Sequence, residues 1–245
     1  MPGEPLATLS GEASESMQGR DPSRGIAVIT ASGGLLYSEN GDEQMETASV
    51  IKVVVMACVM ARAEQQGRYV DEWELSLMWP MITYSDNDAT DTLWSDLGGG
   101  PGVTACLSEL GIAGIVPYDG PHWGTSTASA TGMATLMARL TFGELVSPAH
   151  RAVVLAMLTS VVAEQRWGVP AGADDSGQEI VGVKDGWYPD DDGWRVNSVG
   201  FISPLSAGPE PYAIAVMTNY QTTQEYGIET IEALALPVYN ELRGN

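Results

Sequence analysis

The chain has 245 residues, a formal net charge of −21 and a hydrophobic content of 44%. A chain of this length and composition can bury a substantial core, which excludes global disorder. A surface this acidic repels polyanions, so we do not expect a nucleic-acid partner. The two cysteines, Cys58 and Cys106, lack the spacing of a zinc site, and we expect neither a metal nor a cofactor. The cysteine count leaves open whether they form a disulfide bond.

Residues 1–23 mix turn formers with charges and follow neither the helical nor the strand period, which predicts a flexible N-terminal arm. This segment has no basic start followed by an apolar run, so we expect no export signal within it. The longest apolar run, residues 53–61, is too short to span a membrane. We therefore expect no membrane span, and a cytoplasmic location if the sequence is complete.

The next residues predict a β-hairpin followed by a long helix. Strand-forming residues at 25–31 and 35–38 flank a glycine turn. Residues 47–67 then combine a hydroxyl cap at Thr47, a nearly all-apolar middle and a terminal glycine, which predicts a central helix. Because β-branched residues cluster at 50–55, a strand there remains an alternative.

The rest of the chain predicts a block of helices followed by strands. Helices are expected at 72–82, 89–97, 103–110, 127–141, 148–162 and 223–242, and strands at 179–183, 196–202 and 212–218. Strands at both chain ends imply one sheet assembled from distant segments, an α+β fold with an antiparallel sheet flanked by helices. We expect one domain over residues 24–245, with a helical lobe inserted at about residues 50–166.

The two lysines of the chain point to its chemistry. Every other basic residue is an arginine, so Lys52 and Lys184 have been kept against a strong bias. A buried lysine can lose its proton near neutral pH, whereas an arginine cannot, and this favours a proton-handling role. Lys52 follows Ser49 by three residues, so on a helix both side chains lie on one face. A desolvated lysine next to a second cation is a base able to activate a serine hydroxyl.

Two further motifs follow in order along the chain. Ser85-Asp86-Asn87 lies in a break between predicted helices, and Lys184-Asp185-Gly186 lies on a predicted strand. Together with Ser49-x-x-Lys52, these motifs resemble the triplet of the class A β-lactamases and the penicillin-binding D-alanyl-D-alanine peptidases. The stretches 81–90 and 184–187 are also similar to actinobacterial serine hydrolases of this superfamily. The resemblance extends from about residue 25 to residue 242.

The resemblance implies a role for each matched residue. Ser49 would form the acyl-enzyme, Lys52 would be its base, and Ser85 would pass a proton to the leaving group. Asn87 would hold Lys52 or the substrate amide, and Lys184 would steer substrate charge. The substrate would be a small-molecule or peptide-like acyl compound, and no cofactor would be needed. The resemblance does not imply an oligomeric state.

The same resemblance places an oxyanion hole at the backbone N–H groups of Ser49 and Trp187. Gly186 precedes Trp187 because a side chain at that position would crowd the acyl group. Gly186 and Asp185 are therefore expected to contact the substrate.

Two positions depart from the family pattern. Asp185 replaces the usual hydroxyl residue of the third motif, and an anion there would repel a substrate carboxylate. Alternatively, Asp185 points away and pairs with Arg195 or Lys184. The second departure is that residues 112–125 contain no Glu to activate a deacylating water, and only Asp119 and His122 are candidates to replace it. Trp123, with Trp187 and Trp194, is expected either to line a cleft or to pack in the core.

The sequence therefore favours a serine acyl-hydrolase that acts on an amide, an ester or a lactam and hydrolyses penicillins poorly. The alternative is a ligand-binding protein without catalytic activity, or an acyltransferase, on the same scaffold. Relatives of this superfamily are commonly exported, so the resemblance favours export where the sequence alone does not.

Overall fold

The computed structural model describes residues 23–173, 178–205 and 209–243, together with Gly11. The predicted arm over residues 1–23 therefore lies almost entirely outside the described residues. The predicted division of the chain into an arm and one domain remains an expectation.

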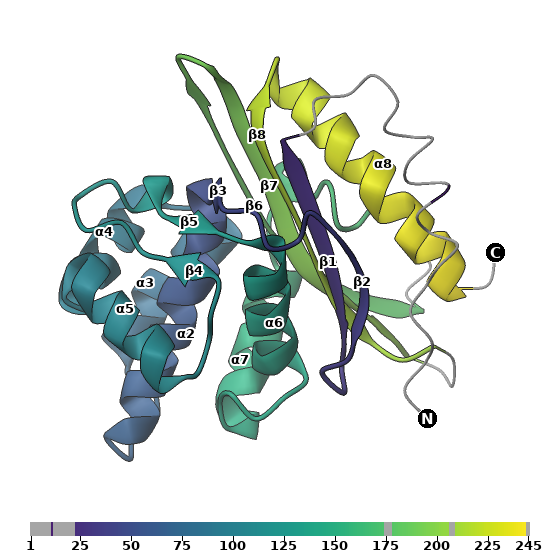
Figure 1. Ribbon diagram of the computed structural model, residues 1–245. Coiled ribbons are helices and arrows are strands. Elements are labelled where there is room, and N and C mark those ends of the chain that lie inside the picture. Colours follow the sequence, from purple (N-terminus) through teal and green to yellow (C-terminus); the bar gives the residue numbers. More distant parts are fainter. Residues whose placement is uncertain (1–10, 12–22, 174–177, 206–208, 244–245) are drawn as a thin grey trace.

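The main sheet joins the two ends of the described chain. Its strands are β1 (Arg24–Thr30), β2 (Leu35–Glu39), β6 (Glu179–Asp190), β7 (Gly193–Pro204) and β8 (Tyr212–Gln221). Their order is β2-β1-β8-β7-β6 and every pairing is antiparallel. The first strand thus pairs with the last, with Val28 opposite Ile214. The predicted α+β fold with a sheet from both chain ends is confirmed (Figure 1).

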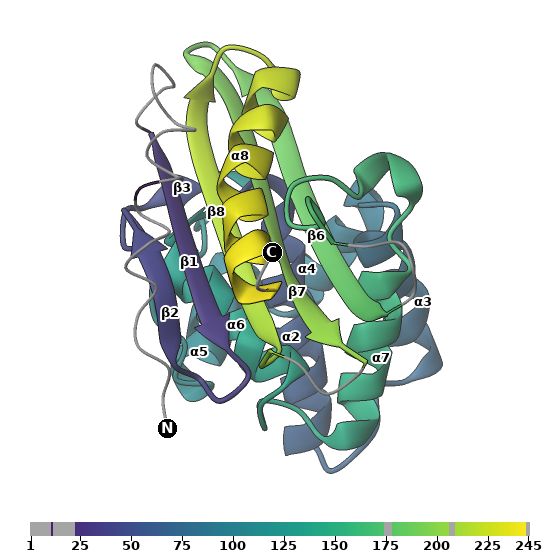
Figure 2. The same ribbon diagram turned by 90° about the vertical axis from the view of Figure 1, so that its right-hand side faces the viewer.

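Helices cover both faces of this sheet. Helix α8 (Gln224–Arg243) packs on one face against β7 and β8. Helix α6 (Ala130–Thr141) packs on the opposite face against β1 and β8, and α7 (Pro148–Thr159) packs against β6. Figure 2 shows α8 lying along the sheet, on the side away from the other helices.

The remaining helices gather at one side of the sheet (Figure 1). They are α2 (Ile51–Gln65), α3 (Glu72–Thr83), α4 (Asn87–Asp96) and α5 (Gly99–Glu109). A small second sheet of order β3-β5-β4 lies beside them, formed by β3 (Met45–Glu46), β4 (Ile115–Val116) and β5 (Thr127–Ala128). This small sheet was not predicted, and β5 occupies residues that were assigned to the start of a helix.

Helix α2 is the central helix that the apolar run predicts. Almost all of its residues are buried, and the strand alternative for residues 50–55 is wrong because those residues continue from a 3-10 turn, η1 (Ala48–Val50), into the helix. Thr47 does not cap the helix, since its hydroxyl donates to the Gly124 carbonyl at 3.5 Å. Gly67, with φ of 67°, ends the helix as predicted, and Arg68 N donates to the Ala63 carbonyl.

A disulfide bond joins α2 to α5. The sulfur atoms of Cys58 and Cys106 are bonded, and the two Cα atoms lie 5.9 Å apart. The sequence left this pairing open. The bond ties the most buried helix to the outer part of the helical layer.

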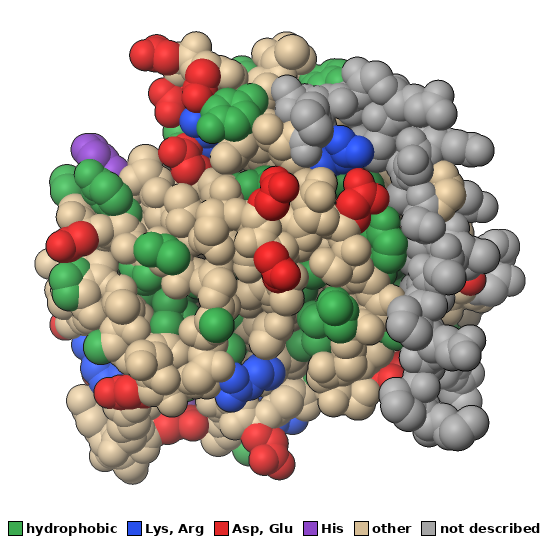
Figure 3. Space-filling view, viewed as in Figure 1, with side chains coloured by type: hydrophobic (Ala, Val, Ile, Leu, Met, Phe, Trp, Pro, Cys, Tyr) green, Lys and Arg blue, Asp and Glu red, His purple; other side chains and the backbone are tan. Residues whose placement is uncertain are grey.

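Acidic side chains are scattered over the surface rather than gathered in one patch on the face shown in Figure 3. On this face, the negative charge is therefore a property of the surface as a whole rather than of one site for a cationic ligand. Among the described residues, no helix combines the length and the hydropathy needed to cross a bilayer.

Candidate active site

Ser49 lies in the 3-10 turn that leads into α2, with Ala48 and Val50 buried on either side of it. The backbone of Ala48 is left-handed, with φ of 47°, a conformation that a residue with a side chain adopts only when its surroundings hold it there. Asn197 supplies part of that support, because its Nδ2 donates to the carbonyls of Glu46 at 2.8 Å and Thr47 at 3.1 Å. Strand β7 therefore holds the segment that presents the Ser49 hydroxyl.

Lys52 is fully buried one turn further along the same helix. Its ammonium donates to the Ser85 carbonyl at 2.6 Å, to Ser85 Oγ at 3.0 Å and to Asn87 Oδ1 at 2.8 Å. All three acceptors are neutral oxygens. They come from the break between α3 and α4, so the second predicted motif does meet the first.

The break between α3 and α4 is itself held in a constrained shape. Ser85 has φ of 57°, and Asp86 caps α4 by accepting a hydrogen bond from Ala89 N at 2.8 Å. This geometry directs the carbonyl oxygen and the hydroxyl oxygen of Ser85 at Lys52. It also places Asn87 at the first position of α4.

The third motif completes the cluster. Lys184 of β6 is fully buried, and its Nζ donates to Ser85 Oγ at 3.0 Å and to the Asp185 carbonyl at 2.7 Å. Ser85 Oγ thus accepts a hydrogen bond from each lysine. With both lone pairs occupied, the hydroxyl proton of Ser85 is left to donate elsewhere.

The surroundings of the two lysines favour loss of a proton. Burial, followed by the charge of Lys184, lowers the pKa of Lys52 from its usual 10.5 to about 7. Burial likewise lowers the pKa of Lys184 to about 8, although the nearby Asp185 charge opposes this shift. Lys52 therefore loses its proton close to neutral pH.

The Ser49 hydroxyl and the Lys52 amine lie on neighbouring turns but are not hydrogen-bonded to each other. Within the described residues, no hydrogen bond joins Ser49 Oγ to Lys52 Nζ, because the three acceptors on Ser85 and Asn87 already occupy the amine. Hydrogen bonds between a nucleophile and its base are often long in a free enzyme and tighten when substrate binds.

Gly186 brings β6 directly against the nucleophile turn. A Cβ atom built on Gly186 would lie 2.6 Å from Ser49 N and 2.7 Å from Val50 N, closer than real contacts allow. Only glycine fits at this position. The reason is the approach of two backbones, rather than crowding of an acyl group alone.

The free edge of β6 faces the same turn. Strand β6 ends the main sheet, and its one partner among the described strands is β7. The Asp185 carbonyl accepts a hydrogen bond from Lys184 Nζ, whose other partner, Ser85, lies outside the sheet. In an antiparallel strand the N–H and C=O of one residue point to one edge and residue i+2 shares that edge, so the Trp187 N–H points to the free edge as well.

Asp185 does not line the cavity, which favours the alternative in which it points away. Its side chain is fully buried, and its Oδ2 accepts a hydrogen bond from Trp167 N at 3.1 Å. Burial raises the pKa of the Asp185 carboxyl, and a hydrogen bond from Ser198 is the next largest influence and acts in the opposite direction. Successive residues of a strand face opposite sides, so Asp185 points away where Lys184 points in.

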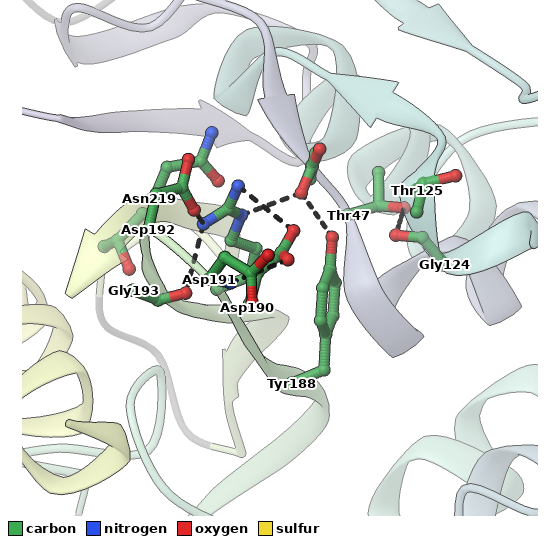
Figure 4. Close-up of polar contacts among 12 residues, drawn as sticks. Thr47, Gly124, Thr125, Tyr188, Asp190, Asp191, Asp192, Gly193 and Asn219 are labelled. Carbon is green, nitrogen blue, oxygen red and sulfur yellow. Dashed lines mark hydrogen bonds and ion pairs between the residues drawn. The ribbon is translucent and has the colours of Figure 1, made fainter. Parts of the chain in front are cut away.

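The expected pairing of Asp185 with Arg195 is wrong. Arg195 Nε binds Glu46 Oε2 at 2.7 Å, and the guanidinium contacts Asp192 and lies 3.6 Å from Asp190. The hydroxyl of Tyr188, labelled in Figure 4, also donates to Glu46. Three carboxylates, those of Glu46, Asp190 and Asp192, therefore surround the Arg195 guanidinium.

A cavity of about 540 Å³ opens beside Ser49. Of the predicted residues, it is lined by Ser49, Asn87, His122, Trp123 and Trp187. Trp194 is half-buried and packs against the core instead. Asp119 lines a neighbouring cavity.

Sequence reasoning missed Asp91, Pro121 and Tyr188 in this cavity. Asp91 lies on α4 one turn after Asn87, and that helical spacing was the one signal able to identify it. Within the described residues, no group of three or more histidine, cysteine or acidic side chains is placed to hold a metal ion.

Comparison with known proteins places the chain in a family. The sequence model described as "Beta-lactamase enzyme family" matches residues 75–242. Curated relatives from Mycobacterium bovis and Mycobacterium tuberculosis, named "Putative lipoprotein LppW", are 28% identical over 232 residues, covering 90% of this chain and 70% of theirs.

Solved structures share the fold at lower identity. The TLA-3 extended-spectrum beta-lactamase has a TM-score of 0.84 at 17% identity, covering 96% of this chain and 98% of the other. An ancestral class A beta-lactamase has a TM-score of 0.80 at 22% identity, and the match covers 96% of this chain and 100% of the other. The expected β-lactamase-like fold is confirmed.

Proposed function

Because the chain belongs to the beta-lactamase enzyme family, we propose that it is a serine acyl-hydrolase whose Ser49 forms an acyl-enzyme with an amide, an ester or a lactam. The observation that carries the proposal is the hydrogen-bonded chain Lys52–Ser85–Lys184 beside the Ser49 turn. It supplies a base and a proton donor within one cluster.

In the acylation step, Lys52 as the neutral amine takes the proton of Ser49 Oγ, which attacks the acyl carbon. Ser85 then donates its proton to the leaving group and regains one from the lysines that contact it. Asn87 fixes the Lys52 amine. The charge on Lys184 favours the proton transfer through Ser85.

The oxyanion hole in this proposal uses the N–H groups of Ser49 and Trp187. The close contact of Gly186 with the Ser49 turn supports it, as does the direction of the free edge of β6. Two main-chain donors fixed in this way would stabilise the negative charge that develops on the acyl oxygen.

The substrate would lack a carboxylate on the side of the cavity that β6 lines with Trp187 and Tyr188. The hydroxyl residue that would bind one is replaced by Asp185, which points into the protein. The guanidinium of Arg195, on the neighbouring strand β7, is occupied by acidic side chains. Penicillins carry such a carboxylate, and residues 112–125 contain no Glu, so we expect slow hydrolysis of penicillins.

Export is the location that the relatives favour, since those of Mycobacterium are named as lipoproteins. The Cys58–Cys106 bond supports the same proposal, because disulfides persist mainly in oxidising compartments. A location outside the cytoplasm replaces the expectation drawn from the N-terminal residues alone.

A mass-spectrometric screen of β-lactams, aryl esters and short acyl peptides tests the proposal. We expect a covalent adduct of the mass of the acyl group, followed by release of the hydrolysed product. A wild-type adduct that never yields hydrolysed product would favour the binding protein over the enzyme, whereas slow release of product would still support the enzyme. Fast nitrocefin hydrolysis at low protein concentration would contradict the proposed carboxylate discrimination.

A further inference from the structure

The indole ring of Trp123 lies next to the ammonium group of Lys52. Lys52 Nζ lies 4.7 Å from the centroid of the indole ring, within the range of a cation–π contact. Trp123 lines the cavity, whereas Lys52 is fully buried and does not. The indole therefore separates the base from the space that a substrate would enter.

A second contact fixes the indole in that position. Its Nε1 donates to Asp91 Oδ1 at 2.6 Å. Among the described residues, Asp91 is the one carboxylate that lines this cavity. Since the Oδ1 atom of that carboxylate accepts from the indole N–H, the contact fixes the ring.

These contacts bear on the second half of the reaction. To hydrolyse an acyl-enzyme, water adds to the acyl carbon, a base takes the water proton, and the bond from that carbon to Ser49 Oγ breaks. The proton then returns to Ser49 Oγ and a carboxylic acid leaves. This step needs a water molecule within reach of Lys52 or of a carboxylate, and the indole lies between Lys52 and the cavity.

We propose that Trp123, held by Asp91, is a positioning residue that keeps water away from Lys52 and so makes the Ser49 acyl-enzyme long-lived. The inference rests on the proposed function, because it needs an acyl group on Ser49. It assigns Trp123 to deacylation and leaves the chemistry of acylation to the three motifs.

The test follows the acetyl-enzyme formed with p-nitrophenyl acetate, by intact mass after removal of the reagent. We expect Trp123→Ala to acetylate fully and to lose the acetyl group about tenfold faster than the wild type, or more, because a base can then activate water. Trp123→Phe keeps a ring over Lys52 and should restore the slow decay. Where the alanine variant does not fold, Trp123→Val makes the same comparison.

Two controls separate this role from a general structural one. Trp73 is 47% exposed on α3 and takes no part in the site, so Trp73→Ala should decay within about threefold of the wild type, the scatter expected for a surface change. Asp91→Asn keeps an acceptor for the indole N–H, so its acetyl-enzyme should also decay slowly.

If Trp123→Ala and Trp73→Ala lost the acetyl group at the same rate, the inference would be overturned. Fast decay in Trp123→Phe would also overturn it, because the ring alone would then not protect the acyl-enzyme. Failure of the wild type to acetylate on Ser49 would instead count against the proposed function itself.

Discussion

Two amines share one hydroxyl oxygen in this site, and the charge of one amine affects the protonation of the other. Ser85 Oγ accepts hydrogen bonds of 3.0 Å from both Lys52 and Lys184. Neighbouring like charges and burial both disfavour the cation, and the pKa of Lys52 falls to about 7. Lys52 is therefore the amine that is neutral in part at physiological pH.

The rate of Ser49 acylation should rise as pH increases through about 7, since only the neutral amine of Lys52 can take a proton. Labelling rates with a fluorophosphonate, measured from about pH 5 to about pH 9, give this profile. Lys52→Arg keeps the charge but cannot act as a base, and should label about 10² to 10⁴ times more slowly. A flat profile, or an arginine variant close to the wild type, would exclude Lys52 as the base.

At the scale of elements, the contact between β6 and the nucleophile turn is the tightest constraint on the site. The edge strand approaches so closely that a Cβ on Gly186 would meet Ser49 N at 2.6 Å. The position of that strand fixes both Lys184 and the Trp187 N–H relative to Ser49. A small displacement of β6 would move both groups relative to Ser49.

Gly186→Ala should therefore reduce acylation about 10²- to 10³-fold, the loss typical of one oxyanion donor. Gly124→Ala is a matched control, because a Cβ there would lie 3.9 Å from the nearest atom, Ala48 Cα, which is ordinary contact. Burst labelling and thermal unfolding of both variants give the comparison. Full labelling by Gly186→Ala would mean that the strand does not supply the oxyanion hole.

Sequence patterns identified the long elements well because their signals extend over many residues. The apolar run and terminal glycine of α2 and the paired strands β1 and β2 are examples. The two-residue strands β3, β4 and β5 offered no period to detect. Two directions were open for Asp185, and strand alternation from Lys184 favours the one that the structure shows, away from the cavity. The Trp123 contact needed three-dimensional information, because 70 residues separate it from Lys52 and no motif joins them.

At the scale of the molecule, long-range connections hold the two parts of the site together. Ser49 and Ser85 come from the helical layer, and Lys184 from a strand near the other chain end. The Cys58–Cys106 bond closes a separation of 48 residues within the helical layer. A loop of that length contributes about 4 kcal/mol in the chain-entropy account of disulfide stability.

Reduction of this bond should lower the thermal midpoint by about 5 to 15 °C, given the size of the chain. Scanning fluorimetry with and without a reducing agent measures the shift. The double variant Cys58→Ala and Cys106→Ala is the control, and its midpoint should not respond to the reagent. A wild-type midpoint insensitive to complete reduction would show that the bond does not stabilise the fold.

The covalent attachment point is the most direct test of the account. The wild type is labelled with a fluorophosphonate, digested, and the modified residue located by tandem mass spectrometry. We predict a single modification on Ser49, which lies beside the Lys52 and Ser85 cluster, and no label on Ser49→Ala. A label on any other residue, or labelling that survives Ser49→Ala, would contradict it.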